Sequence, residues 1–164
     1  MKKITLLLFL IVGISTDLRS GVVNNYNDEY SYKINHSRLY SKLIEHGVKH
    51  PDIAFAQALL ESAYYKSPLF NRANNLFGMQ MPTKRPTTAT GITNGYSKYQ
   101  TWSHSVLDYK LLQEALFKRK GEMNRGEYLK YIDRWYSKDG KYIIKIKSII
   151  KKHSYIFANH KSHI

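Results

Sequence analysis

The sequence predicts a mainly α-helical domain with a loop-rich lobe and a small β-hairpin. Apolar residues recur at helical spacing on both sides of the chain's middle. Between these helical parts, residues 66–101 are rich in Asn, Thr, Gly and Pro and show no helical period. A connection this long usually builds a functional surface. The 164 residues suffice for one domain with its own core.

Two helices are predicted before the loop-rich lobe. The first covers residues 36–46, where apolar side chains share one face, and Gly47 is a plausible stop. The second starts at Pro51, a residue suited to a first helical turn, and extends to about Tyr65. Because this segment is apolar on nearly every side, we expect it to be the central buried helix.

The loop-rich lobe contains a hairpin signal. Asn94-Gly95 is typical of a type I′ turn, and it separates the short runs 91–93 and 96–99. The sequence therefore predicts two short antiparallel strands within an otherwise irregular lobe.

Three further helices are predicted after the lobe. The first begins with Ser103 as its N-cap and ends in the basic residues 118–120. A shorter helix covers residues 125–136. The last covers residues 141–157, where alternating Ile and Lys would also suit a strand, but the i, i+3, i+4 spacing of its isoleucines favours a helix.

The N-terminus has the layout of a secretory signal peptide. Two lysines precede an apolar run in MKKITLLLFLIVGIST, which is short for a membrane span. We expect a signal peptide at 1–20, an extended lead-in at 21–35, the catalytic domain at 36–158 and a basic tail at 159–164. An uncleaved anchor is the alternative; after signal removal we expect no stable membrane insertion and a secreted or periplasmic monomer.

The net charge and the absence of cysteine limit the catalytic groups and the binding partners that the protein can have. Lys and Arg number 26 against 12 Asp and Glu, for a net charge of +14, and there is no cysteine. Disulfides and a thiol nucleophile are therefore excluded. An exported protein this basic is expected to meet anionic wall polymers or acidic glycans rather than nucleic acid, although the charge would also serve solubility alone. The seven histidines show no metal-ligand spacing, so we predict no metal and no cofactor.

One carboxyl group stands out in the second helix. Between residues 53 and 65 the strongly polar side chains are Gln57 and Glu61, four residues apart and therefore on one face. Such a stripe on a buried helix suggests that this face lines a cleft. Partial desolvation would raise the pKa of Glu61 toward the range that a general acid needs near neutral pH.

The lobe after this helix has the composition of a sugar-binding surface. No Asp or Glu occurs between Glu61 and Asp108, while amides, hydroxyls, basic groups and aromatics abound. Amides and hydroxyls match sugar substituents, and flat aromatics stack on sugar faces. A solvated loop with ordinary aromatic anchors is the alternative. The candidate substrate-binding residues are Gln57, Asn74, Asn75, Phe77, Tyr96, Tyr99, Trp102 and Asp108.

Four blocks of the sequence resemble a known family. AQALLESAYYKS followed by NNLFGMQ resembles the bacterial glucosaminidase family of peptidoglycan hydrolases, whose pattern is close to AQAxLESGWGxS and NNLFGIK. Further on, YSKYQTWSHSVLDY is similar to the family's Tyr/Phe-x-x-Tyr-x-x-x-x-x-Ser-x-x-Asp-Tyr segment, and RWYSKDGKYIIKIKSII to its YATDPNYAxKI ending. The blocks occur in the family's order and span residues 56–150.

The resemblance implies a lysozyme-like, two-lobed helical fold. It also implies hydrolysis of a β-1,4 bond next to N-acetylglucosamine in peptidoglycan. The family's catalytic glutamate corresponds to Glu61, as proton donor to the leaving oxygen. The family's YATD tyrosine corresponds to Tyr136, which would orient the substrate's N-acetyl group or the attacking water. Asn75 and Tyr99 would line the cleft, and Phe77 would shape it.

Two departures from the family pattern affect the mechanism. Where the family has Gly-Trp-Gly, this chain has Ala63-Tyr64-Tyr65, and the lobe lacks the second acid that members often carry. Asp108 is the nearest candidate for that acid, but a structural hydrogen bond suits its place early in a helix better. Glu61 would then act nearly alone, with either the substrate's 2-acetamido group or water as nucleophile.

We therefore predict an endo-β-N-acetylglucosaminidase whose substrate is peptidoglycan or a related N-acetylglucosamine-containing glycan. The alternatives are an N-acetylmuramidase, which cuts the other glycosidic bond, and a non-catalytic peptidoglycan-binding protein on the same fold.

Overall fold

A computed structural model of the protein describes residues 33–136 and 140–161. The predicted signal peptide and nearly all of the lead-in lie outside the described residues. Within the described part, no helix is long and apolar enough to cross a membrane. The elements are α2 His36–Glu45, α3 Pro51–Glu61, α4 Pro68–Ala73, β1 Gly91–Thr93, β2 Tyr96–Lys98, α5 Trp102–Lys120, α6 Arg125–Tyr136, α7 Tyr142–Lys152 and α8 Ser154–Lys161.

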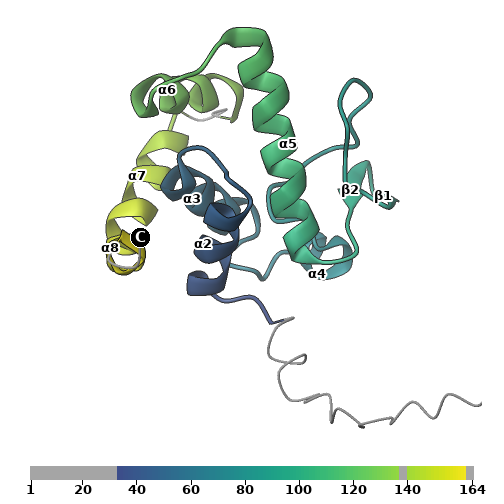
Figure 1. Ribbon diagram of the computed structural model, residues 1–164. Helices are drawn as coiled ribbons and strands as arrows, with labels where there is room; N and C mark the ends of the chain where they lie inside the picture. Colours follow the sequence, from purple (N-terminus) through teal and green to yellow (C-terminus); the bar gives the residue numbers. More distant parts are fainter. Residues whose placement is uncertain (1–32, 137–139, 162–164) are drawn as a thin grey trace, which may run out of the picture. The chain divides into compact units, whose positions relative to one another are not determined.

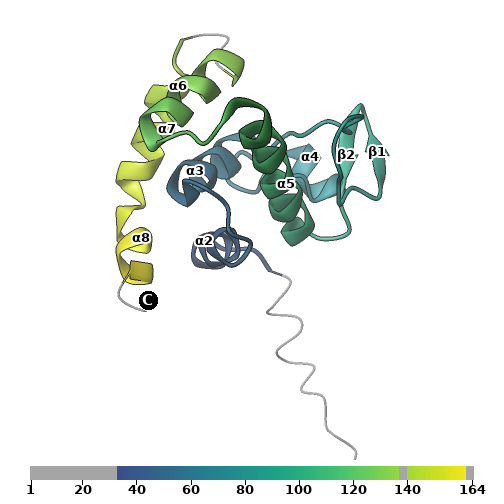
Figure 2. The same ribbon diagram turned by 45° about the horizontal axis from the view of Figure 1, so that its top comes forward.

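The predicted mainly helical fold with one small β-hairpin is confirmed. Helix α5 lies between two groups of elements, with α2, α3, α7 and α8 on one side and α4, β1 and β2 on the other, as both views show (Figure 1, Figure 2). The two groups correspond to a helical lobe and a loop-rich lobe. The last residue of α3, Glu61, borders the loop-rich lobe, since it lines one hollow together with residues of α4 and of the hairpin.

Helix α3 is the central buried helix. Every residue from Ile53 to Leu59 is buried, and the helix packs against α2 and α7. Pro51 occupies its first turn, as expected. The helix ends at Glu61, earlier than the predicted Tyr65, because the next residues leave the helical conformation. The acidic side chain thus occupies the last turn rather than the middle of the helix.

The loop-rich lobe holds the predicted hairpin and one helix that was not predicted. Strands β1 and β2 pair antiparallel around Asn94 and Gly95, whose φ angles of 48° and 81° fit the type I′ turn. Within the same lobe, α4 was missed because a helix of 6 residues is too short to show a period. Its N-cap is Ser67, whose hydroxyl accepts a hydrogen bond from the amide of Phe70.

The last helical segments differ from the prediction in detail. Helix α5 has Thr101 rather than Ser103 as its N-cap. The Ile- and Lys-rich segment is helical, as predicted, but it breaks at His153 into α7 and α8. Residues 159–161, expected to begin a tail, belong to α8.

A buried ion pair attaches the loop-rich lobe to α5. The guanidinium of Arg85 donates to both carboxylate oxygens of Asp108, at 2.9 and 3.0 Å. Asp108 is 0% exposed and also accepts a hydrogen bond from the hydroxyl of Tyr99, at 2.8 Å. Burial alone would raise the pKa of Asp108, but the hydrogen bonds from Arg85 and Tyr99 outweigh it and hold that pKa below its ordinary value.

We predict that Arg85→Met destabilises the fold strongly. The substitution leaves the Asp108 carboxylate buried without its cation, which typically costs about 3–5 kcal/mol. Urea denaturation at neutral pH measures the loss. Lys84→Met, an exposed change next to it, is the matched control and should alter the free energy of unfolding by less than about 0.5 kcal/mol. Equal effects of the two substitutions would contradict a stabilising role for the ion pair.

Candidate active site

Glu61 occupies the last turn of α3, half-buried at the edge of the core. Burial raises the pKa of its carboxyl group above the ordinary value of 4.5, and a hydrogen bond from Tyr142 partly opposes that shift. The carboxyl group is therefore protonated to a higher pH than an exposed glutamate. This is the property that a proton donor working near neutral pH requires.

Tyr142 holds one oxygen of Glu61. Its hydroxyl donates to Oε1 at 3.1 Å from the first turn of α7. Tyr142 was not among the residues predicted from the sequence, although it lies in the fourth family-like block. A signal was present, because Tyr142 shares the buried face of its helix with Ile146 and Ile149, and a buried tyrosine needs a partner for its hydroxyl.

A chain of side-chain hydrogen bonds continues from Tyr142 into the core. Gln57 donates to the hydroxyl of Tyr142 at 3.1 Å and accepts from that of Tyr109 at 2.5 Å. The hydroxyls of Tyr109 and Tyr128 lie 2.7 Å apart, and Gln113 donates to Tyr128 at 3.1 Å. We call these five residues the Tyr–Gln chain. It joins side chains of α3, α5, α6 and α7.

The hydrogen bonds of the Tyr–Gln chain run in one direction when Glu61 is ionised. A carboxylate only accepts, so Tyr142 must donate to it, and Gln57 must then present its NH₂ to Tyr142. Tyr109 gives its single hydroxyl proton to Gln57, which leaves Tyr128 as donor to Tyr109. Every donor therefore points toward Glu61, and hydrogen bonds aligned in this way strengthen one another.

The second oxygen of Glu61 faces the loop after α4. A Cβ atom built on Gly78 would lie 3.7 Å from Oε2, so the backbone passes close to this oxygen. The side chain of Asn75 holds that loop in place. It donates to the carbonyls of Met79 and Ser97 and accepts from the amides of Phe77 and Met79. Asn75 thereby fixes the position of Gly78 opposite the carboxyl group.

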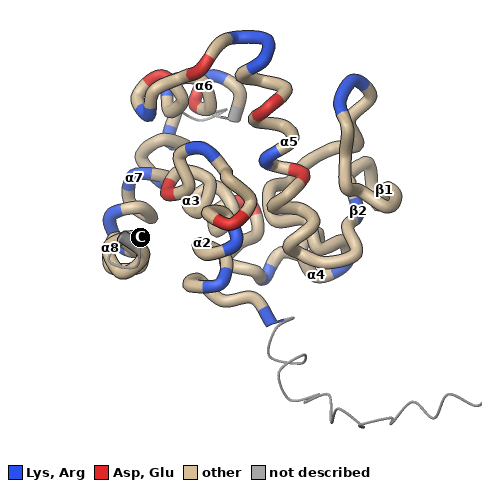
Figure 3. The backbone as a smooth tube through the Cα atoms, viewed as in Figure 1, with Lys and Arg blue, Asp and Glu red and all other residues tan. Residues whose placement is uncertain are grey.

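An open hollow of about 300 Å³ lies against Glu61. We call it the Glu61 hollow. Of its lining residues only Glu61 is acidic, whereas Arg72 supplies a cation and Tyr96 an aromatic ring that is 38% exposed. Helix α4 and strand β2 carry the basic residues Arg72 and Lys98 and no acidic residue, and β1 is uncharged (Figure 3). The lining residues are Glu61, Ser67, Pro68, Leu69, Arg72, Thr93, Asn94 and Tyr96.

Of the predicted substrate-binding residues, Tyr96 lines the Glu61 hollow. Gln57 was expected to line a cleft, but it is 2% exposed and both atoms of its amide group are used within the Tyr–Gln chain. Asn75, Phe77, Tyr99, Trp102 and Asp108 are also buried.

These buried residues and Asn74 contact other parts of the protein. Phe77 stacks on Tyr109, with ring centroids 4.2 Å apart. The amide of Asn74, the left-handed residue after α4, donates to the carbonyls of Tyr99 and Gln100. The structure thus places most of the predicted residues behind the site, where they support it, rather than on its surface.

Tyr136, the second predicted catalytic residue, is the last residue of α6, and its side chain lies outside the described part of the protein. Its role stays a prediction. Among residues 33–136 and 140–161, no group of three His, Asp or Glu side chains is arranged to hold a metal ion.

The turn after Glu61 has an uncommon backbone. Ala63, Tyr64 and Tyr65 all have positive φ angles, of 49°, 55° and 69°. Residues with a Cβ atom adopt this left-handed region at a cost of roughly 1–2 kcal/mol each. Contacts of the side chains hold the turn, since the hydroxyl of Tyr65 bonds to the ring nitrogen Nδ1 of His36 and its amide to the hydroxyl of Ser62. The turn fixes where α3 ends and where Glu61 lies.

We predict that Ala63→Gly stabilises the protein. Ala63 is exposed, so no packing is lost, and glycine adopts the left-handed conformation without strain. After subtraction of the extra entropy of glycine in the unfolded chain, we expect a gain of about 0.5–1 kcal/mol in urea denaturation. The matched control is Ala158→Gly in α8, which is exposed but helical and should lose about 0.5–1 kcal/mol. A lower free energy of unfolding for both variants would contradict the inference that the backbone at Ala63 is strained.

Comparisons with known proteins bear on this geometry. The model of the glucosaminidase family, described as mannosyl-glycoprotein endo-beta-N-acetylglucosaminidase, matches residues 36–155. The structure is similar to the catalytic domain of the autolysin Auto from Listeria monocytogenes, with a TM-score of 0.50 and 19% identity over 79% of this chain and 93% of that one. At this identity the likeness concerns the fold. No curated protein matches the chain.

Proposed function

Because the chain belongs to the glucosaminidase family of glycoside hydrolases, we propose that it is an endo-β-N-acetylglucosaminidase that cuts β-1,4 bonds of peptidoglycan with Glu61 as its single general acid. The observation that carries the proposal is the state of Glu61. Its carboxyl group is half-buried, one oxygen is held by Tyr142, and the group borders an open hollow. A glycosidase needs such a proton donor beside its scissile bond.

The first chemical step uses the protonated form of Glu61. The carboxyl group gives its proton to the glycosidic oxygen as the bond from that oxygen to C1 breaks. Positive charge develops on the sugar ring. The nucleophile at C1 is either the carbonyl oxygen of the substrate's own 2-acetamido group or a water molecule. The carboxylate left behind is stabilised by the hydrogen bond from Tyr142 and by the aligned donors behind it.

In the part of the chain that the structure describes, the Glu61 hollow is lined by no second acid, and this favours the acetamido route. Retaining enzymes that use two acids keep their carboxyl groups about 5 Å apart. The lining of the hollow holds one carboxyl group, and Asp108 is committed to its ion pair with Arg85. In the acetamido route the sugar supplies the nucleophile, and Glu61 later removes a proton from the water that opens the cyclic intermediate. Tyr136 is proposed to orient the acetamido group or the water.

We further propose that the protein acts outside the cytoplasm. The signal-like N-terminus supports export, and the substrate is a wall polymer. The net charge of +14 would favour contact with anionic wall components.

Replacement of Glu61 by glutamine tests the proposed activity. Glu61→Gln keeps the size of the side chain and an oxygen for Tyr142 but removes the transferable proton. We expect release of soluble fragments from purified peptidoglycan to fall at least about 100-fold. The wild-type digest, reduced and analysed by mass spectrometry, should show N-acetylglucosamine at the new reducing ends. N-acetylmuramic acid there would establish the muramidase alternative, and no cleavage by the wild type would favour the non-catalytic alternative.

Thermal unfolding is the control for the fold of this variant. Because burial raises the pKa of Glu61 in the folded state, its contribution to stability is greatest at low pH and is lost as the pH rises through that pKa. Neutral glutamine avoids this loss. The variant should therefore unfold at or above the wild-type temperature at pH 7, with the difference vanishing below the ordinary glutamate pKa of 4.5. A variant as lytic as the wild type would overturn the role of Glu61.

The pH dependence of hydrolysis tests the link between Tyr142 and Glu61. Tyr142 lowers the pKa of Glu61 by its hydrogen bond, so Tyr142→Phe should raise that pKa. A general acid works in its protonated form, and the basic limb of the kcat/KM profile should accordingly move to higher pH. The profile is measured on soluble peptidoglycan fragments. Tyr155→Phe, the same chemical change on α8, should leave the limb unchanged. A uniform loss of rate without a shift would mean that Tyr142 is only structural.

A further inference from the structure

A larger hollow, distinct from the Glu61 hollow, lies between α5, α6 and the loop at residues 82–85. Its volume is about 680 Å³, within the usual range for ligand sites. Its lining shares no residue with the Glu61 hollow. We call it the α5–α6 groove. The residues that matter here are Lys84, Leu112, Arg119, Tyr131 and Trp135.

Aromatic rings of α6 form one wall of the α5–α6 groove. Trp135 is 68% exposed, and its ring centroid lies 6.2 Å from that of Tyr131. Tyr131 stacks in turn on Tyr128, at 6.5 Å with planes 12° apart. Tyr128 and Ile132 of the same helix are buried, whereas Trp135 is open to solvent. A flat apolar ligand face laid on Tyr131 and Trp135 would cover apolar surface that water now contacts.

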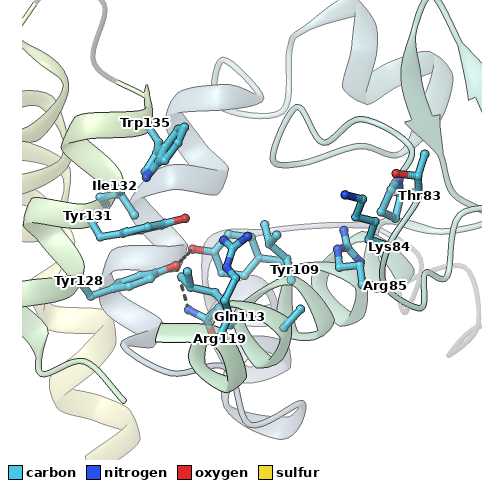
Figure 4. Close-up of a pocket in the computed structure, with 14 residues that line it drawn as sticks. Thr83, Lys84, Arg85, Tyr109, Gln113, Arg119, Tyr128, Tyr131, Ile132 and Trp135 are labelled. Atoms are coloured by element: carbon cyan, nitrogen blue, oxygen red, sulfur yellow. Dashed lines mark hydrogen bonds between the residues drawn. The ribbon is translucent and has the colours of Figure 1, made fainter. Parts of the chain in front are cut away.

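Basic groups face this wall. Lys84 lies on the loop opposite α6, and Arg119 rises from α5 (Figure 4). Neither pairs with a carboxylate among the described residues, whereas the neighbouring Arg85 is taken up by Asp108. Among the described residues, none that lines the groove is acidic. The exposed rings and the two cations together fit a ligand that has both a flat apolar face and a negative charge.

The floor of the groove connects it with the proposed catalytic residue. Tyr109, Gln113 and Tyr128 line the groove and belong to the Tyr–Gln chain, which ends on Glu61 (Figure 4). Tyr136, proposed to act on the substrate, directly follows Trp135 in the sequence. The same polymer that is cut at Glu61 is therefore the occupant best matched to this place.

We propose that the α5–α6 groove is a binding subsite for the anionic, peptide-bearing part of the glycan strand, with a sugar ring on Trp135 and Tyr131 and a carboxylate of the lactyl or peptide group between Lys84 and Arg119. This inference rests on the proposed function. Single-stranded nucleic acid also combines flat rings with negative charge. It is treated below as an outcome of the test.

Intrinsic fluorescence gives a direct test. The chain has two tryptophans, and Trp102 is only 8% exposed, so a change on ligand addition reports Trp135. The protein is the Glu61→Gln variant, which holds ligand without cutting it. The probes are a disaccharide–tetrapeptide muropeptide and neutral chitotetraose. We expect the muropeptide to bind more tightly than chitotetraose and to shift the emission of Trp135. In Trp135→Phe, the emission shift should disappear.

Substitutions in the groove measure each contribution. Trp135→Ala, followed by calorimetry, should weaken binding of both sugars roughly 2- to 10-fold. Lys84→Ala and Arg119→Ala should each weaken muropeptide binding and leave chitotetraose binding unchanged. Lys118→Ala and Tyr155→Ala are the matched controls, since they remove an equal charge or an exposed ring outside the groove, and both should bind like the parent.

Three results would overturn the proposal. One is muropeptide binding that survives Trp135→Ala, Lys84→Ala and Arg119→Ala unchanged. Another is equal affinity for muropeptide and chitotetraose, and the third is tighter binding of a single-stranded oligonucleotide at Trp135. A lysis assay of the wild-type protein on peptidoglycan distinguishes a failure of the subsite proposal from a failure of the proposed hydrolase function. Lysis without groove binding removes the subsite alone, whereas Trp135-dependent muropeptide binding without lysis removes the hydrolase function alone.

Discussion

The hydrogen bond from Tyr142 to Glu61 is the contact on which the site depends. It joins the last turn of α3 to the first turn of α7, two elements separated by 81 positions in the sequence. The acidity of Glu61 reflects the balance between burial, which favours the neutral acid, and this one donor, which favours the carboxylate. Because Tyr142 accepts a hydrogen bond from Gln57, which Tyr109 holds in turn, the balance is a property of several packed helices.

Much of the fold follows from local pattern. The helices at α2, α3, α5 and α6 and the hairpin at Asn94-Gly95 are set by periodicity and turn chemistry that neighbouring residues carry. Helix α4 and the break at His153 were not predictable in this way. The first is too short to show a period, and the second lies between two segments that share the same apolar spacing, with no glycine or proline to mark it.

The site was predictable only in part, because its contacts are long-range. Glu61 stood out as an isolated acid in an apolar helix, and this is a local signal. The burial of Gln57 and the pairing of Asp108 with Arg85 were not visible, since the partners Tyr142 and Arg85 are distant in the sequence, although a structural hydrogen bond was expected for Asp108. A polar residue on the same helical face as a catalytic acid can either form buried hydrogen bonds that hold the acid in place or contact the substrate. Sequence spacing does not distinguish these two arrangements, whereas burial does.

The acid-free lobe has a kinetic consequence. Over α4, β1 and β2 the fixed charges are positive, and the Glu61 hollow includes Arg72 (Figure 3). A low-dielectric surface with charges of one sign concentrates anions near it and speeds their diffusional encounter. For the proposed substrate, an anionic wall polymer, this field would increase the fraction of collisions that bring the polymer to the lobe beside Glu61. The missing second acid thus changes the rate of encounter as well as the chemistry, because a carboxylate there would weaken this field.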